Sequence, residues 1–184
     1  MRQLSLYLLL FLCAPAWAGV PERLQEANFA PQWSMAGKIL TRKGQGVLDY
    51  LWVDVYAAAL YASPTTNASE AIENNGDLRL ELFYFHDIGR DDVIKAATAT
   101  LKRQLAPAQM ASLQPGLDAL HSHFSDIHPG DRYALIRHAG AGIDLERNGA
   151  IVFKSTDPQL ATAYLNLWLA PNGLSQSLRE SLTH

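Results

Sequence analysis

The alternation of apolar and polar positions predicts β-strands in three parts of the chain. Residues 44–63, "GQGVLDYLWVDVYAAALYAS", are interpreted as one long strand with aliphatic side chains on one side and large aromatic side chains on the other. Residues 78–85, "LRLELFYF", alternate with a period of two. Residues 131–155 contain two further strands, and Asn148-Gly149 between them is a typical hairpin turn.

Helices are predicted between and after these strands. Residues 89–105, "GRDDVIKAATATLKRQL", carry acids at the start and bases at the end, as the helix dipole favours. A second helical stretch opens at Pro107, and Pro115 within it predicts a kink or two short helices. Asp157 is a typical N-cap for another helix, and a short last helix is expected from Ser175. This order of elements favours an α+β fold, with an antiparallel sheet covered by helices on one face.

The N-terminus has the features of an export signal. Arg2 precedes a short apolar run that ends in Ala16-Trp17-Ala18, the small-x-small pattern of a cleavage site, and the run is shorter than a membrane span needs. We therefore expect residues 1–18 to be a cleaved signal peptide and residues 19–184 to be a single domain, periplasmic or secreted. A retained anchor and a lipoprotein attached at Cys13 are the less favoured alternatives. Cleavage removes the only cysteine, which excludes disulfides from the mature chain.

Charge and composition exclude several classes of partner. The chain has 15 basic and 18 acidic residues, and its formal net charge is −3. Because no basic block is present, nucleic acids and anionic membrane surfaces are not expected as partners. No apolar run after the leader is long enough to cross a membrane, so the mature chain is expected to carry no transmembrane segment.

Four segments together resemble the chalcone isomerase-like family, specifically its exported bacterial branch. They are residues 44–63, "LRLELFYFHDI", "HPGDRYALIRHAGAGIDLERNGAIVF" and "LWLAPNGLSQSLRESL", in this order. The resemblance extends from about residue 37 to residue 182. It implies an open-faced β-sandwich, in which a large antiparallel sheet is covered by helices on one face and a ligand cleft lies between the two layers.

The resemblance also implies where a catalytic site would be. Plant members of the family that close a ring stabilise a phenolate with an arginine on the strand corresponding to residues 44–63, and relatives that hold fatty acids clamp the carboxylate with the same arginine. In this sequence Leu48 occupies that position, and Tyr56 occupies the position of a threonine in the same site. Isomerase chemistry is therefore not expected. The basic residues considered as substitutes are Arg42, Arg90, Arg132 and Arg137.

One face of residues 44–63 is the candidate wall of a ligand pocket. Tyr50, Trp52, Asp54 and Tyr56 combine apolar surface with a few polar groups, as ligand pockets do. The alternative is that these aromatic residues only pack in the core and Asp54 reaches solvent. The residues predicted to bind the ligand are Leu48, Tyr50, Trp52, Tyr56 and Arg90.

Other kinds of site receive little support. The cluster His121, His123, Asp126 and His128 invites a metal interpretation, but residues two apart on a helix do not share a face, so surface histidines are favoured. No nucleophile elbow, phosphate loop or dinucleotide motif is present. We expect no catalytic residue, no metal and no cofactor.

The favoured function is that of a non-catalytic protein that binds a small apolar or amphipathic ligand, fatty-acid-like or aromatic, between sheet and helices. Two alternatives stay open. One is an isomerase or lyase in which Arg90 supplies the missing cation beside Tyr56. The other is a protein-interaction module whose cleft is filled by its own side chains.

Overall fold

The computed structural model describes residues 19–35 and 37–184, so the predicted leader lies outside the described residues. The described chain forms a seven-stranded antiparallel sheet in which each strand pairs with the next along the sequence. The strands are β1 (Gln32–Met35), β2 (Lys38–Tyr50), β3 (Val53–Ala62), β4 (Leu78–Tyr84), β5 (Arg132–Arg137), β6 (Ile143–Arg147) and β7 (Ala150–Ser155).

Six helices accompany the sheet in the described residues. They are α1 (Val20–Ala27), α2 (Ala68–Glu73), α3 (Arg90–Gln104), α4 (Pro107–His121), α5 (Pro158–Leu169) and α6 (Gln176–Thr183). Within the described part of the chain, no helix is both long and apolar enough to span a bilayer. The predicted α+β fold with an antiparallel sheet is confirmed.

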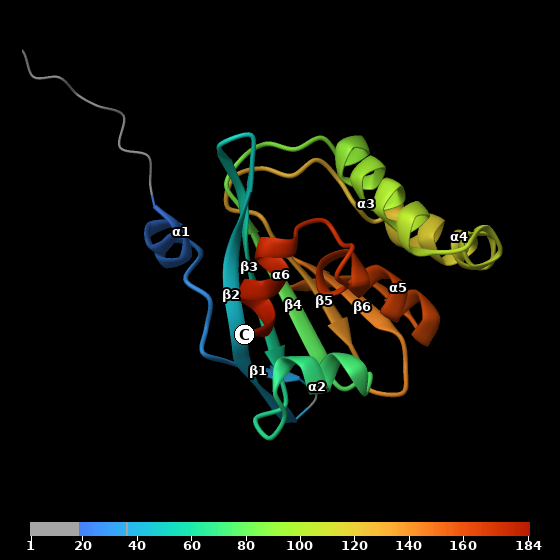
Figure 1. The fold of residues 1–184 in the computed structure, drawn as a ribbon, viewed down its shortest axis with the longest axis horizontal. Helices are drawn as coiled ribbons and strands as arrows, with labels where there is room; N and C mark the ends of the chain where they lie inside the picture. Colours follow the sequence, from blue (N-terminus) through green and yellow to red (C-terminus); the bar gives the residue numbers. More distant parts are fainter. Residues whose placement is uncertain (1–18, 36) are drawn as a thin grey trace, which may run out of the picture.

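The helices divide unequally between the two faces of the sheet (Figure 1). Helices α2 to α6 cover one face and contribute to the larger part of the core. The other face was expected to be open, but α1 and the segment after it pack there. Ala27, Phe29 and Met35 form a second, smaller core with Ala59 and Tyr61 of β3. The side chains of β3 therefore alternate between two buried environments.

The prediction of one long strand over residues 44–63 is wrong. β2 ends at Tyr50, the chain reverses, and β3 starts at Val53 as the partner of Tyr50. The two turn residues, Leu51 and Trp52, have φ angles of 49° and 69°. Turns of this type usually contain Asn-Gly, because few side chains tolerate positive φ, so the sequence carries no turn signal here.

The other local predictions fare better. The hairpin at Asn148-Gly149 joins β6 to β7, and both residues have positive φ, as such a turn requires. The helix over residues 89–105 is confirmed as α3, and Asp157 caps α5 by accepting hydrogen bonds from two backbone N–H groups. α4 runs without interruption through Pro115, so the expectation of two short helices is wrong.

Candidate functional site

A cavity of about 580 Å³ lies between the sheet and helices α3 and α5. Its size is in the range of small-molecule sites. Most of its wall is apolar or aromatic. The lining residues are Leu48, Asp49, Tyr50, Val55, Tyr56, Leu82, Tyr84, Ile88, Asp92, Val93, Ala96, Ala97, Phe124, Tyr133, Leu135, Leu145, Tyr164, Leu167, Trp168, Leu174 and Ser175.

Three tyrosines from neighbouring strands form the floor of the cavity. Tyr56 of β3 is the register partner of Tyr84 of β4, and their ring centroids are 5.2 Å apart. Tyr84 in turn meets Tyr133 of β5 edge to face, with centroids 6.0 Å apart. Aromatic side chains on adjacent strands of one face contact one another because their Cβ atoms are close. The sheet register therefore places three phenol groups side by side.

The helical layer supplies the opposite wall. Tyr164 and Trp168 are four residues apart on α5, so they lie on the same face of the helix, and their rings are 6.3 Å apart. The indole Nε1–H of Trp168 donates a hydrogen bond of 2.8 Å to the hydroxyl oxygen of Tyr56. This bond joins α5 directly to β3 across the edge of the cavity.

Three of the buried tyrosines that line the cavity, Tyr56, Tyr84 and Tyr164, have raised pKa values and are therefore neutral at physiological pH. Burial raises the pKa of Tyr56, and the hydrogen bond from Trp168 only partly opposes this rise. Burial also raises the pKa of Tyr84, with smaller contributions from the neighbouring phenols, and it alone raises the pKa of Tyr164. No side-chain hydrogen bond lowers the pKa of Tyr84 or Tyr164 as that from Trp168 does for Tyr56.

The charged groups of the cavity are confined to its rim. Asp49 at the end of β2 and Asp92 in the first turn of α3 are exposed, whereas Tyr84 and Tyr164 are buried. The exposed residues mark the side on which the cavity meets solvent. None of the described residues that line the cavity is an arginine, lysine or histidine.

The hairpin turn separates the predicted ligand-binding residues of this region. Leu48, Tyr50 and Tyr56 do line the cavity, Tyr50 from the rim. Trp52 does not, because it lies at the tip of the hairpin with 84% of its surface exposed. Asp54 also points elsewhere and forms an ion pair of 3.1 Å with Arg23 of α1. Of the predicted wall of Tyr50, Trp52, Asp54 and Tyr56, the structure places Tyr50 and Tyr56 in the cavity lining and Trp52 and Asp54 outside it.

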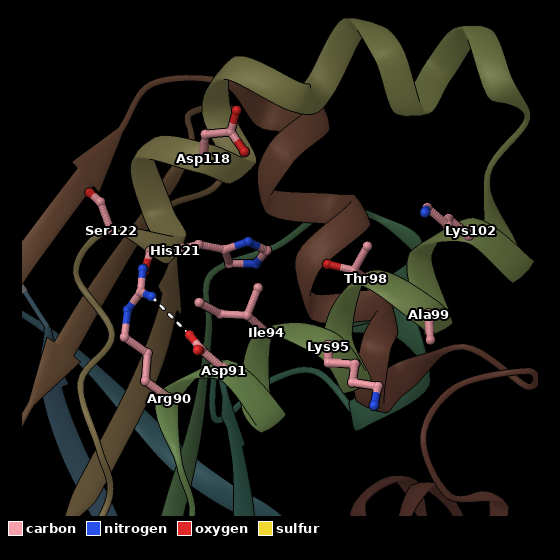
Figure 2. A pocket seen from close by; sticks show the side chains of 10 residues that line it. All are labelled: Arg90, Asp91, Ile94, Lys95, Thr98, Ala99, Lys102, Asp118, His121 and Ser122. Carbon is pink, nitrogen blue, oxygen red and sulfur yellow. Dashed lines mark hydrogen bonds and ion pairs between the residues drawn. The ribbon is translucent and has the colours of Figure 1, made fainter.

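Arg90 lies outside the cavity, contrary to the prediction. Its guanidinium donates hydrogen bonds to the backbone carbonyls of Phe124, at 3.0 Å, and His121, at 3.1 Å. It also contacts Asp91, and together they line a hollow between α3 and α4 (Figure 2). These contacts tie the start of α3 to the end of α4, so Arg90 cannot supply a cation to Tyr56 without breaking them.

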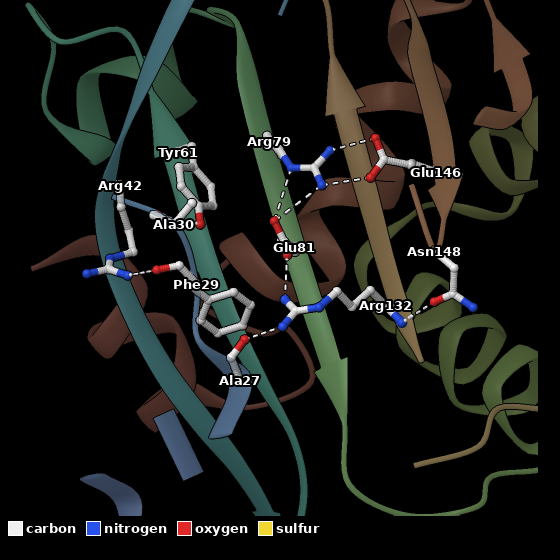
Figure 3. Close-up of polar contacts among 10 residues, drawn as sticks. All are labelled: Ala27, Phe29, Ala30, Arg42, Tyr61, Arg79, Glu81, Arg132, Glu146 and Asn148. Atoms are coloured by element: carbon white, nitrogen blue, oxygen red, sulfur yellow. Dashed lines mark hydrogen bonds and ion pairs between the residues drawn. The ribbon is translucent and has the colours of Figure 1, made fainter. Parts of the chain in front are cut away.

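The other candidate basic residues also bind elsewhere, and Figure 3 shows the contacts of Arg42 and Arg132. Arg42 donates to the carbonyl of Phe29, and Arg132 donates to the carbonyl of Ala27 and to Glu81. Both therefore bind the N-terminal segment on the face away from the cavity. Arg137 donates to the carbonyls of Gly76 and Ala71 at the end of α2, where burial lowers its pKa to about 10.

The histidine cluster is not brought together into a metal site. In the part of the chain that the structure describes, no three histidine, cysteine or acidic residues are grouped as metal ligands. His121 is buried against Phe124 and Tyr164, whereas His128 is exposed and contacts Asp87 at 2.7 Å. Asp126 accepts a hydrogen bond from the backbone N–H of Arg90. These residues thus serve three separate local structures.

Comparison with known families agrees with this architecture. The model of the family described as chalcone isomerase-like matches residues 21–183. The chain belongs to the chalcone isomerase-like family. Among solved structures, the chain is similar to a fatty-acid binding protein of Arabidopsis thaliana, with 16% identity and a TM-score of 0.61, covering 84% of this chain and 90% of that one. At this identity the likeness concerns the fold of the family. No curated protein sequence matched the chain.

Several cavity residues were not predicted from the sequence. Tyr84 lies in the predicted alternating strand over residues 78–85, and the sequence pattern gives no ligand-binding role to Tyr133, Tyr164 or Trp168. The four-residue spacing of Tyr164 and Trp168 was a usable signal for a shared helix face. Their meeting with the tyrosines of the sheet depends on how α5 lies across it, which no local pattern contains.

Proposed function

We propose that this member of the chalcone isomerase-like family binds a small apolar or amphipathic ligand in the cavity between sheet and helices. The observation that carries the proposal is a cavity of about 580 Å³ with a mainly apolar and aromatic wall, whose lining includes Tyr56, Tyr84 and Tyr164. The phenol hydroxyls of such a lining can form hydrogen bonds with a ligand oxygen. The name of the similar Arabidopsis protein, a fatty-acid binding protein, is consistent with a binding role.

The arrangement gives less support to the two alternative functions. Ring closure of a phenolate needs a cation or strong donors at the developing oxyanion, and the described lining contains no basic side chain. An interaction module with a filled cleft does not agree with a cavity of this volume. We therefore favour binding without chemical conversion of the ligand.

The first experiment is mass spectrometry of an organic extract of the protein, purified without detergent from the compartment in which it accumulates. A stoichiometric apolar or amphipathic compound is the expected result. A matched pair of variants tests whether this compound lies in the cavity. Ala97 lines the cavity on α3, whereas Ala99 on the same helix is exposed. Ala97→Phe should abolish copurification, because the ring occupies the cavity, and Ala99→Phe should preserve it.

Either of two results would contradict the proposal. One is an empty extract followed by no binding in titrations with apolar and amphipathic compounds. The other is equal retention of the compound by both variants, which would place it elsewhere on the protein. Circular dichroism of both variants shows whether the fold is retained.

We also propose that residues 1–18 direct export and are removed after Ala18. The support is the sequence pattern of a short apolar run followed by Ala16-Trp17-Ala18. N-terminal sequencing of the protein recovered from a periplasmic or secreted fraction tests this. A chain that begins at Gly19 is expected, and a chain that retains Arg2 in the cytoplasm would refute the proposal.

A further inference from the structure

The polar groups of the cavity are divided by charge and by depth. Neutral phenol hydroxyls lie inside, and carboxylates lie at the rim. We propose that the cavity selects uncharged ligands that carry a hydroxyl or carbonyl oxygen, and discriminates against carboxylates such as fatty-acid anions. This inference rests on the proposed binding function and specifies its ligand class.

A bound carboxylate would find no cation in the described lining. Transferring an ionised carboxylate from water into an apolar site is costly, and neutral phenol donors offset less of this cost than a paired cation does. Here the charged side chains of the lining are Asp49 and Asp92, which have the same sign as the ligand. An anion entering past this rim is repelled, whereas an uncharged molecule is not.

Basic groups close to the lining already have partners. The guanidinium of Arg147 lies 5.8 Å from the ring centre of Tyr133 and forms an ion pair of 3.7 Å with Asp131. The guanidinium of Arg90 bonds to two backbone carbonyls in the connection between α3 and α4. The N-terminus of α3 could attract an anion through the helix dipole, but Asp126 accepts the hydrogen bond of the Arg90 backbone N–H at 2.9 Å. Asp91 and Asp92 add two acids to this first turn. Three acidic side chains therefore surround this helix end, and they disfavour the approach of a further anion.

The inner hydroxyls suit a neutral oxygen. Tyr84 and Tyr164 are 4% and 1% exposed, respectively, and both line the cavity. The oxygen of Tyr56 accepts the indole hydrogen bond of Trp168, which leaves its own O–H proton available for donation. A ligand hydroxyl can both accept from and donate to such phenols, and a ligand carbonyl can accept from them. The aromatic floor and aliphatic walls take the apolar skeleton.

The test compares ligands that differ only in their polar group. Naphthol is uncharged at pH 7, whereas naphthoate has the same bicyclic skeleton and is an anion; decanol and decanoate form a second pair. We expect isothermal titration calorimetry on the mature protein to show that the alcohol of each pair binds at least about tenfold more tightly than the acid. Equal or tighter binding of the acids would overturn the selectivity while leaving the binding function intact. Absence of binding by all four compounds would instead contradict the binding function itself.

Three variants with charge changes test the cause of the selectivity. Asp49→Asn and Asp92→Asn are at exposed positions and should retain the fold, and each should raise the affinity for naphthoate relative to the affinity of the same variant for naphthol. Leu48→Arg places a cation in the lining and should reduce or reverse the preference for naphthol over naphthoate. Leu51→Arg is the control, since it adds the same charge at the exposed hairpin tip. Unchanged naphthoate affinity in both asparagine variants would remove the electrostatic explanation.

Discussion

The two faces of the sheet bury polar groups in opposite ways. On the face covered by the N-terminal segment, Arg79 is 4% exposed and donates to both carboxylate oxygens of Glu146, at 3.0 and 2.8 Å. Arg79 and Arg132 both bind Glu81, which completes a chain of ion pairs (Figure 3). The opposite face also buries an arginine, Arg137, which donates to backbone carbonyls at α2, but the polar groups inside its cavity are the phenols of Tyr56, Tyr84 and Tyr164.

The difference follows from how each face is closed. The ion pairs are covered by aromatic rings: the guanidinium of Arg79 lies 4.1 Å from the centre of the Trp33 ring, and that of Arg132 lies 4.7 Å from that of Phe83. The buried charges of Arg79, Glu81 and Glu146 all have partners on this face, and the aromatic rings cover the ion pairs. The cavity face keeps space and neutral hydroxyls instead. The paired face is thus closed by its own side chains, whereas the other face contains the cavity that we propose to bind a ligand.

The largest effect is expected from breaking the paired face. Arg79→Met leaves Glu146 buried without its bidentate partner, so we expect the free energy of unfolding to fall by about 3–5 kcal/mol. Urea unfolding followed by circular dichroism measures it. Adding Glu146→Leu to Arg79→Met should restore much of the loss, since no unpaired charge remains. A single variant within about 1 kcal/mol of wild type would contradict the account of this face.

A smaller effect is expected at the one described polar bond between sheet and helix in the cavity wall. Tyr56→Phe removes the acceptor of the Trp168 indole N–H, and leaving that buried donor unpaired should cost about 1–3 kcal/mol of unfolding free energy. Tyr50→Phe is the control, because Tyr50 is 68% exposed. Equal stability of the two variants in urea would mean that the bond contributes nothing.

A change in the hairpin turn between β2 and β3 should stabilise the protein, in contrast to the two changes above. Replacing Leu51-Trp52 by Asn-Gly suits the positive φ angles and removes little packing, so we expect the free energy of unfolding to rise by about 1 kcal/mol. Affinity for a cavity ligand should not change, since Trp52 lies outside the lining. Trp52→Ala, which keeps a Cβ at positive φ, is the control and should not show the gain. A loss of ligand affinity would show that Leu51 or Trp52 contributes to ligand binding.

The smallest expected effect concerns the pH dependence of the helical layer. Burial lowers the pKa of His121 below its usual value of 6.5, with Arg90 also lowering it and Asp118 opposing. The unfolded chain therefore binds a proton more readily than the folded one, and stability contributed by neutral His121 is lost as the pH falls below about 6.5. His121→Phe should flatten this decline in thermal unfolding between pH 7 and 5, whereas His123→Phe, at an exposed position, should not. If the unfolding temperature fell equally steeply with pH in the two variants, His121 would be excluded as the cause of the decline in stability.

The sequence alone predicted the elements that have strong local signals. The alternation of residues 78–85, the charge asymmetry of α3 and the Asn148-Gly149 turn each act over a few residues, so their outcome did not depend on distant contacts. The resemblance of four ordered segments likewise predicted the family and the sheet with its helical layer. The turn at Leu51-Trp52 escaped prediction because its residues oppose the backbone conformation that they adopt.

Only the tertiary structure decided what the cavity contains. The position of Leu48 in the lining was predicted, but the partners of Tyr56 come from β4 and α5. Arg90 lies outside the cavity because its guanidinium binds backbone carbonyls more than thirty positions later in the chain. Likewise, each charge of the Arg79 network needs a partner from another strand. The sequence determined which side chains were available. The packing of α5 and of the N-terminal segment on opposite faces of the sheet decided which polar side chains became paired and which line the cavity. Local sequence could not decide this, because pairing depends on distances between segments that are remote in the chain.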